Sequence, residues 1–452
     1  MAARRVVLAE YFITSEVTFL FVAREDFDEP EVMLIPLSLP QITDFMGRSF
    51  REERDSEGNV TISTHEKLQA LDETGFQDLF SPLVQPLAEL SHRNDLISEE
   101  GDLIWFVPHD VLHYFPLHAL KVEGRHLFER NPVCYTPSAA VMKYCQSKRT
   151  GRRKSALVFA DSRNDLIHAR DEAIVISSLF QTTPFLGEHA TKATLLEQLS
   201  QNSFDVLHFS CHGYFNKAEP LQSGIVLAEA ENDDETDDQS DAATLTANEI
   251  FELQLNADLI TLSACESGVS EREPGDELIG LTRALIFAGT PSVLVSLWSV
   301  DDLSTSLLIE RFYEKLMGTE SEAPLNKAEA LRAAQLYVKN LPAKEVVERA
   351  EVRLAGLDRP EQGDLRWSLL TNKAYAQTVA GDLPAAIETY SQLLTQMKES
   401  GVSQDQMLSA EQRLELLRFK DAESPVTEIN YEVQPFSHLY HWAPFVLVGD
   451  WK

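Results

Sequence analysis

The 452-residue sequence is poor in cysteine, poor in basic residues and free of long apolar runs. Its four cysteines lack the close paired spacing of a disulfide framework, so a reducing compartment is expected. The 39 basic residues face 72 acidic ones, and the net charge of −33 repels nucleic acid and anionic membranes, which leaves basic or neutral polypeptide as the expected ligand. No apolar run approaches the roughly 18 residues of a membrane span, and acidic residues follow the two N-terminal arginines too soon for a signal peptide. We therefore expect a cytoplasmic protein.

Two short apolar runs end at residues whose side chains can take part in catalysis. Residues 257–268 (ADLITLSACESG) have strand character and stop at Cys265, and residues 205–213 (DVLHFSCHG) end at His212. Ligands gather at the carboxyl edge of open α/β sheets, because the loops that follow the strands form a crevice there. Only the thiolate of a cysteine is a good nucleophile, so a histidine at the next strand end can activate it. The pattern predicts a catalytic dyad of His212 and Cys265.

The other cysteines and histidines have simpler structural interpretations. Cys211 is expected to be a small packed residue, and His208 is expected to lie in the core of its strand. An H-x-x-C-H metal cluster can be drawn there, but no second ligand cluster has suitable spacing. Three further histidines are expected to pack among aromatic residues, since no thiol lies near them; these are His109, His113 and His118. No metal and no cofactor is expected.

The apolar patterns predict an α/β protein with two unlike halves. Residues 6–39 alternate apolar and polar side chains, which is typical of antiparallel strands, and residues 40–100 show helical spacing. From residue 155 onward, short apolar runs alternate with helical segments, which indicates a parallel sheet covered on both faces. A helix is expected to begin at Asp276, with this residue as its N-cap.

Several stretches carry a family resemblance: LIWFVPHDVLHYFPLHAL (103–120), YTPSA (135–139), GDELIGLTRALIFAGTPSVLVSLWSVDD (275–302) and HWAPFVLVGDW (441–451). Together with the two strand ends, they resemble the CHAT family, separase-related cysteine peptidases of the caspase-like clan that are often coupled to tetratricopeptide (TPR) repeats. The resemblance implies a caspase-like parallel-sheet three-layer sandwich with an N-terminal α+β pseudo-protease half and a C-terminal helical insert. The implied domains are a pseudo-caspase half (1–150), a catalytic half (151–340), a TPR-like insert (341–433) and the closing strand of the catalytic half (434–452).

The resemblance also implies a mechanism. His212 withdraws the thiol proton, Cys265 attacks the peptide carbonyl, and the backbone N–H groups of Gly213 and Cys265 hold the oxyanion. The strand end at Ser296 and Trp298 resembles the edge on which caspase relatives lay the substrate, although Trp298 is equally well explained as a core residue.

The substrate specificity is predicted from a difference between this chain and the peptidases that it resembles. Relatives that cut after Arg or Lys carry an aspartate where this chain has Ser263. Asp276 or Asp301 would restore the missing charge, but helix capping explains both. An uncharged or apolar P1 residue is therefore favoured.

Three segments stand outside this pattern. The basic linker, residues 148–154 (KRTGRRK), is either a solvated connection or a cleavage site. The acidic run 229–241 is interpreted as a solvated loop, with a calcium or basic-partner contact as the alternative, although it lacks EF-hand spacing. Residues 372–394 resemble one TPR unit, with small or aromatic residues at Ala374, Gly381, Ala386 and Tyr390. One repeat cannot bury its own face, so it must dock on neighbouring helices or on a partner. The insert is either such a module or inert.

These observations predict a cysteine endopeptidase that hydrolyses peptide bonds in a protein substrate. The resemblance suggests control by a partner or signal in bacterial defence or cell death, with a pore-forming effector as one candidate substrate and a TPR or other regulatory protein as a partner. The alternative is a non-catalytic caspase-like scaffold for protein–protein interaction, which the presence of both dyad residues disfavours. A hydrolase of small amides would need a closed pocket instead of an open strand edge.

Overall fold

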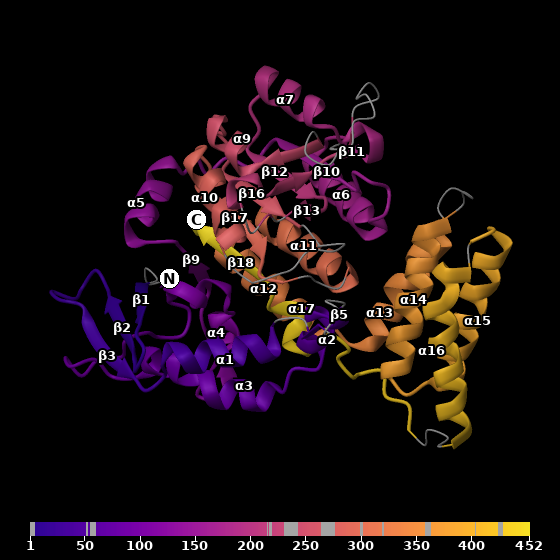
Figure 1. Cartoon of the computed structure of the whole chain (residues 1–452), viewed down its shortest axis with the longest axis horizontal. Coiled ribbons are helices and arrows are strands. Elements are labelled where there is room, and N and C mark those ends of the chain that lie inside the picture. Colours follow the sequence, from indigo (N-terminus) through magenta and orange to yellow (C-terminus); the bar gives the residue numbers. More distant parts are fainter. Residues whose placement is uncertain are drawn as a thin grey trace. The chain divides into compact units, whose positions relative to one another are not determined.

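The computed structural model describes residues 5–50, 53–54, 60–214, 216, 219–229, 243–263, 276–298, 302–318, 321–357, 363–402, 404–423 and 428–452. The chain divides into two compact units, one of Met1–Leu336 with Leu439–Lys452 and one of Tyr337–His438. Figure 1 shows the elements of both units. The insert expected at residues 341–433 lies inside the second unit.

One sheet of eleven strands, counted over the described residues, forms the centre of the first unit. In sheet order its strands are β11 (Phe185–Leu186), β10 (Ala156–Ala160), β12 (Val206–Ser210), β16 (Leu259–Leu262), β17 (Ser292–Ser296), β18 (Phe445–Gly449), β9 (Val133–Tyr135), β6 (Leu103–Val107), β1 (Val6–Ile13), β2 (Thr18–Ala23) and β3 (Glu31–Ile35).

The strands run in two opposed parallel groups. β10, β12, β16 and β17 are mutually parallel, so their carboxyl ends meet at one edge of the sheet. β18 is antiparallel to β17 and parallel to β9, and β9, β6 and β1 continue the second parallel group. β1, β2 and β3 pair antiparallel, as the alternation in residues 6–39 predicted.

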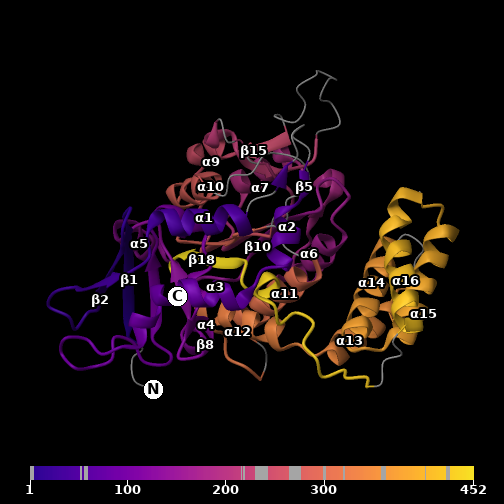
Figure 2. The same cartoon turned by 60° about the horizontal axis from the view of Figure 1, so that its bottom comes forward.

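Helices cover both faces of the sheet and give three layers, which confirms the predicted α/β class. On one face α6 (Ile167–Phe180) packs on β10 and β12 and against α11 (Asp302–Met317). On the other face α10 (Asp276–Phe287) packs on β17 and against α9 (Ala247–Glu252). Figure 2 shows α9 and α10 on one side of β18 and α11 and α12 (Lys327–Asn340) on the other. β10 and β12 are buried along their whole length, because helices exclude water from both faces. None of the helices in the described ranges combines the length and apolar character of a bilayer crossing.

The N-terminal half packs its helices around an aromatic core. The rings of Phe45, Phe76, Phe80 and Phe115 contact one another, with centroids 4.5 to 6.0 Å apart. Two of these rings lie on α3 (Glu73–Phe80) and one on α1 (Leu39–Ser49). The helical spacing of residues 40–100 did not predict the short pair β4 (Glu53–Arg54) and β5 (Val60–Ile62), because so few residues give no clear alternation.

The remaining elements of the first unit are short. They are α2 (Thr64–Gln69), α4 (Leu127–Arg130), α5 (Ala139–Lys148), α7 (Lys192–Gln201) and α17 (Leu439–Trp442); β7 (Lys121–Val122), β8 (Arg125–His126), β13 (Gly213–Tyr214), β14 (Gly224–Val226) and β15 (Thr244–Thr246); and the 3-10 helices η1 (Ser81–Leu83), η2 (Gln85–Ala88), η3 (Asp110–Tyr114), η4 (Leu117–Ala119), η5 (Gly187–His189) and η6 (Pro220–Gln222).

The basic linker is fastened to buried carboxylates. Arg149 Nε donates to Asp450 Oδ2 at 2.6 Å, and the Gly151 amide donates to Asp258 Oδ1 at 3.1 Å. The fully buried Lys327 lies between these carboxylates, with Nζ 2.9 Å from Asp258 and 3.7 Å from Asp450. Most of residues 148–154 are nevertheless exposed, as a solvated connection predicts, and whether the linker is cleaved stays a prediction.

The second unit is a stack of helices. Its described helices are α13 (Ala343–Ala355), α14 (Gly363–Val379), α15 (Leu383–Glu399) and α16 (Gln404–Glu423), each packed on the next. Ala374, Ala386 and Tyr390 are buried in its core, as expected for a TPR-like hairpin. Gly381 has a φ of 80° in the turn between α14 and α15, where glycine is favoured, and the Asp382 side chain caps α15.

Candidate active site

Two adjacent strands lead to the predicted dyad. β12 and β16 pair in parallel, and the last pair of the register joins Phe209 to Leu262. His212 and Cys265 each follow that pair by three residues in the sequence, and the two strands that precede them end at the same edge of the sheet. Cys265 itself lies outside the described residues.

The His212 ring is held by a carboxylate. Its Nε2 donates a hydrogen bond to Asp165 Oδ1 at 2.7 Å. The His212 side chain is 2% exposed and that of Asp165 is 52% exposed, so the carboxylate faces solvent while the imidazole is enclosed. A carboxylate on Nε2 fixes the orientation and tautomer of the ring, and Nδ1 then carries no proton in the neutral imidazole. The arrangement supplies a general base.

Asp165 belongs to the loop between β10 and α6, and a second aspartate shapes this loop. Asp161 has a φ of 50°, and its amide donates to the Ser210 carbonyl at 2.9 Å. Its carboxylate accepts from the Leu166 amide and from Arg170 Nε, both at 2.8 Å. Because β10 neighbours β12, the loops after these strands meet at one edge. Asp165 was not predicted from the sequence, although the polar run DSRND directly after a buried strand was a usable signal.

The thiol next to His212 has a different environment. Cys211 is fully buried, and desolvation raises its pKa to about 12. Such a thiol stays protonated at neutral pH and is a poor nucleophile. Cys211 is a packed core residue, as predicted.

A buried polar network lies below the end of β16. Ser263 Oγ donates to Glu172 Oε2 at 3.2 Å, and Glu172 Oε1 lies 2.9 Å from His208 Nε2. The other ring nitrogen of His208 contacts the Tyr313 hydroxyl at 3.3 Å. His208 therefore lies in the core, as predicted. The Ser263 hydroxyl, predicted to bind substrate, contacts a carboxylate on α6.

The family model of the CHAT domain matches residues 73–450. The chain belongs to the CHAT domain family. The resemblance predicted from the sequence motifs is confirmed.

Curated relatives of this CHAT domain chain are much longer proteins. Tetratricopeptide repeat protein 28 of Homo sapiens is 27% identical over 238 residues, which cover 47% of this chain and 9% of the relative. Tetratricopeptide repeat protein 28 of Mus musculus is 24% identical over 316 residues, which cover 59% of this chain and 13% of the relative. The chain thus spans only a small part of their length.

Solved structures similar to the CHAT domain chain include a separase–securin complex and a cysteine proteinase. The separase–securin complex of Saccharomyces cerevisiae has a TM-score of 0.44 and 14% identity, and the match covers 73% of this chain and 28% of that chain. The Arg-specific cysteine proteinase gingipain R has a TM-score of 0.37 and 11% identity, and the match covers 59% of this chain and 65% of that chain.

The other residues predicted to bind substrate in the CHAT domain lie near β17 and α10. Ser296 pairs with Phe445 of β18, so this side of β17 is already paired within the chain. Trp298 is buried, and its Nε1 donates to the Tyr440 carbonyl at 3.2 Å, which packs the indole against the C-terminal segment. Asp276 is the first residue of α10, and its side chain lies outside the described residues, as do most residues of the acidic run. A substrate role of these residues stays a prediction.

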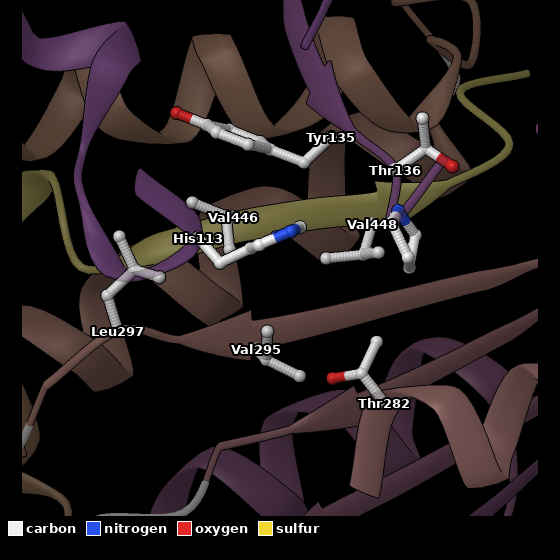
Figure 3. A pocket seen from close by; sticks show the side chains of 9 residues that line it. His113, Tyr135, Thr136, Thr282, Val295, Leu297, Val446 and Val448 are labelled. Carbon is white, nitrogen blue, oxygen red and sulfur yellow. The ribbon is translucent and has the colours of Figure 1, made fainter. Parts of the chain in front are cut away.

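His109, His113 and His118 of the N-terminal half each have different surroundings. His109 Nδ1 accepts from the Ile13 amide at 3.3 Å, and His118 Nδ1 contacts the Tyr135 hydroxyl at 2.8 Å. His113 lines a cavity of about 40 Å³ beside β18 (Figure 3). Burial lowers the pKa of His113 to about 4 and that of His118 to about 3. Within the described residues, no group of three or more His, Cys, Asp and Glu is arranged to hold a metal ion.

Proposed function

We propose that this CHAT domain protein is a cysteine endopeptidase in which His212 activates Cys265. The observation that carries the proposal is the 2.7 Å hydrogen bond from His212 Nε2 to Asp165, at the edge where β12 and β16 end. Thiol activation needs a base whose orientation is set by a third group, and the carboxylate supplies that orientation. Membership of the CHAT family supports the same chemistry.

The proposed reaction has two halves. His212 Nδ1 takes the thiol proton, the Cys265 sulfur attacks the peptide carbonyl carbon, and the N–H groups of Gly213 and Cys265 hold the resulting oxyanion. His212 then returns the proton to the leaving amine as the C–N bond breaks. In the second half His212 deprotonates a water molecule whose oxygen attacks the thioester carbonyl carbon; the C–S bond breaks, the product acid leaves, and the proton on His212 returns to the Cys265 sulfur. Asp165 stabilises the imidazolium formed in both halves.

The proposed substrate is a protein with an uncharged or apolar P1 residue. The presence of Ser263 where basic-specific relatives carry an aspartate supports this choice, because a hydroxyl cannot balance a buried Lys or Arg charge. The nearest carboxylate of the described network, Glu172, is engaged by Ser263 and His208.

We propose that a partner or signal controls the enzyme through the helical second unit. Its TPR-like hairpin and the TPR-containing relatives support this role. Placement in the cytoplasm, in bacterial defence or in cell death, and a pore-forming substrate, rest on the sequence alone.

The test is cleavage of a peptide library that samples every P1 residue, with and without cell extract as a source of activator. We expect cleavage by the wild type and by the control Cys211→Ala, and none by Cys265→Ala or His212→Ala. The control is matched because Cys211 is the buried neighbour of His212. Equal cleavage by all four proteins, or none by a folded wild type under any condition, would contradict the proposal.

The second candidate is a non-catalytic scaffold. The helical unit favours it, because stacked helices are common binding platforms, and the relatives are named for their repeats. A folded chain that binds a partner through residues 337–438 and cleaves no peptide would support this function instead.

A further inference from the structure

A groove lies on the first unit, between α5, α9 and α10, away from the predicted dyad. It has a volume of about 560 Å³, within the range of sites that take a ligand or a partner side chain. Its floor and walls are apolar and aromatic, with Val141, Tyr144, Phe251, Ile286 and Phe287 among the lining residues.

The aromatic residues of the groove are unusually open to solvent. Phe287 is 66% exposed and packs its ring on Phe251 with centroids 5.3 Å apart, and Tyr144 is also exposed. Single exposed apolar residues are ordinary, but a rim of aromatic rings around a concave surface marks an interaction site. Aromatic residues also supply most of the binding energy where protein partners meet.

The charges at the groove oppose the charge of the whole chain. Arg283 lines it, is exposed, and has no ion-pair partner among the residues that the structure describes. Lys148 adds a second cation, since its Nζ lies 5.6 Å from the centre of the Tyr144 ring. Charges act over a Debye length of about 8 Å at physiological ionic strength, so a bound segment senses these cations more than the distant net charge of −33.

The groove lies at the opposite edge of the sheet from His212. Phe251 precedes the first residue of β16 and Phe287 precedes that of β17, whereas His212 follows the last residue of β12, and the three strands are parallel. A ligand in the groove is therefore remote from the proposed scissile bond.

We propose that this groove docks an acidic, amphipathic polypeptide segment of a partner protein. An apolar side chain of the segment fills the space between Tyr144 and Phe287, and carboxylates beside it pair with Arg283 and Lys148. A second copy of this chain is the alternative occupant, and the test below distinguishes it from a partner segment. The proposal does not depend on peptidase activity.

The test is fluorescence anisotropy with the full chain and short labelled peptides that carry Leu and Phe at helical spacing. One series has Glu at the remaining positions and a matched series has Lys. We expect the Glu series to bind, with an affinity that falls as salt rises, and to lose about tenfold or more in Phe287→Ser and in Arg283→Glu. The controls Phe419→Ser and Arg413→Glu replace exposed residues of the second unit and should bind as the wild type does.

Both groove variants replace exposed side chains, so unchanged circular dichroism and melting will show that they fold. Absence of binding by every Glu peptide, tighter binding of the Lys series, or equal binding by groove and control variants overturns the proposal. Self-association of the wild type that Phe287→Ser abolishes would also overturn it, because the groove would then belong to a second copy.

Discussion

The buried imidazole of His212 donates a hydrogen bond from Nε2 to Oδ1 of the exposed carboxylate of Asp165 at 2.7 Å. The two residues come from the ends of neighbouring parallel strands, and 47 positions separate them in the sequence. The pair orients the imidazole before any substrate binds, and this orientation is what the proposed thiol activation uses.

Asp165→Asn should lower kcat while leaving KM nearly unchanged. The amide cannot stabilise the imidazolium and can select the wrong tautomer, so we expect a loss of roughly 10²- to 10⁴-fold in kcat. Asp165→Glu should restore part of it, because the longer side chain keeps the charge. Steady-state kinetics on the best library peptide give both constants, with Asp28→Asn, at a carboxylate that is 92% exposed, as the control. A rise in KM alone would assign Asp165 to substrate binding.

The three described cysteines should resist alkylation in the folded protein. Burial raises the pKa of Cys145 and of Cys211 to about 12, and it also raises that of Cys134. We therefore expect one iodoacetamide adduct at neutral pH, on Cys265, and four after denaturation. Intact mass and peptide mapping read the result. Cys265→Ala should show no adduct when folded, and rapid labelling of Cys211 in that variant would contradict the assignment.

The sequence predicted His212 and the class of sheet because buried parallel strands are continuous apolar runs, and the residues that end them are easy to see. It did not reveal Asp165, because the order β10–β12–β16 is a property of the folded sheet. A lone aspartate in a polar loop looks the same whether it faces water or a histidine. Strand order, more than residue type, was the missing information.

Long-range pairing also explains the other differences. The carboxylates that hold the basic linker could not be predicted because they are distant in sequence, and Arg149 and Asp450 are 301 residues apart in the chain. The sequence around Trp298 does not indicate whether the indole faces substrate or core. In the fold the indole N–H donates to the Tyr440 carbonyl, which is 142 residues away in the chain. Helices such as α15 can be predicted from the sequence, because the N-cap Asp382 and the apolar face of the helix lie within one continuous segment.

Lys327→Met should destabilise the first unit by about 3–5 kcal/mol, because it leaves Asp258 buried next to fewer cations. Burial alone raises the pKa of Asp258, but Lys327 and two amide donors lower it below its ordinary value. A carboxyl with a lowered folded pKa stabilises the protein above its unfolded pKa of 3.8, and that contribution is lost as the pH falls through the folded pKa.

Urea unfolding of Lys327→Met, followed by tryptophan fluorescence, measures this loss. Four of the five tryptophans (Trp105, Trp298, Trp442 and Trp451) lie in the first unit, so the signal reports mainly on it. Lys143→Met, at an exposed position, is the matched control. A change of less than about 1 kcal/mol in Lys327→Met, the size typical of an exposed pair, would show that the ammonium is dispensable.

The buried histidines should make the first unit sensitive to mild acid. His118 and His113 have folded pKa values of about 3 and about 4, below the ordinary 6.5, because burial disfavours the charged ring. Both rings are neutral in both states well above pH 6.5, so stability is complete there. As the pH falls from 6.5 toward 4 the unfolded chain binds protons that the folded chain does not, and each histidine removes about 1.4 kcal/mol per pH unit.

His118→Gln should therefore lose stability less steeply between pH 6.5 and 4 than the wild type, even if it is less stable at pH 8, because one of the two proton-binding rings is gone. Urea midpoints and slopes measured by tryptophan fluorescence across this range test the difference. His189→Gln removes a histidine whose side chain is 77% exposed and should follow the wild-type curve. Parallel curves for the wild type and His118→Gln would show that His118 is protonated equally in the folded and unfolded chain, and the acid sensitivity would then have to come from other groups.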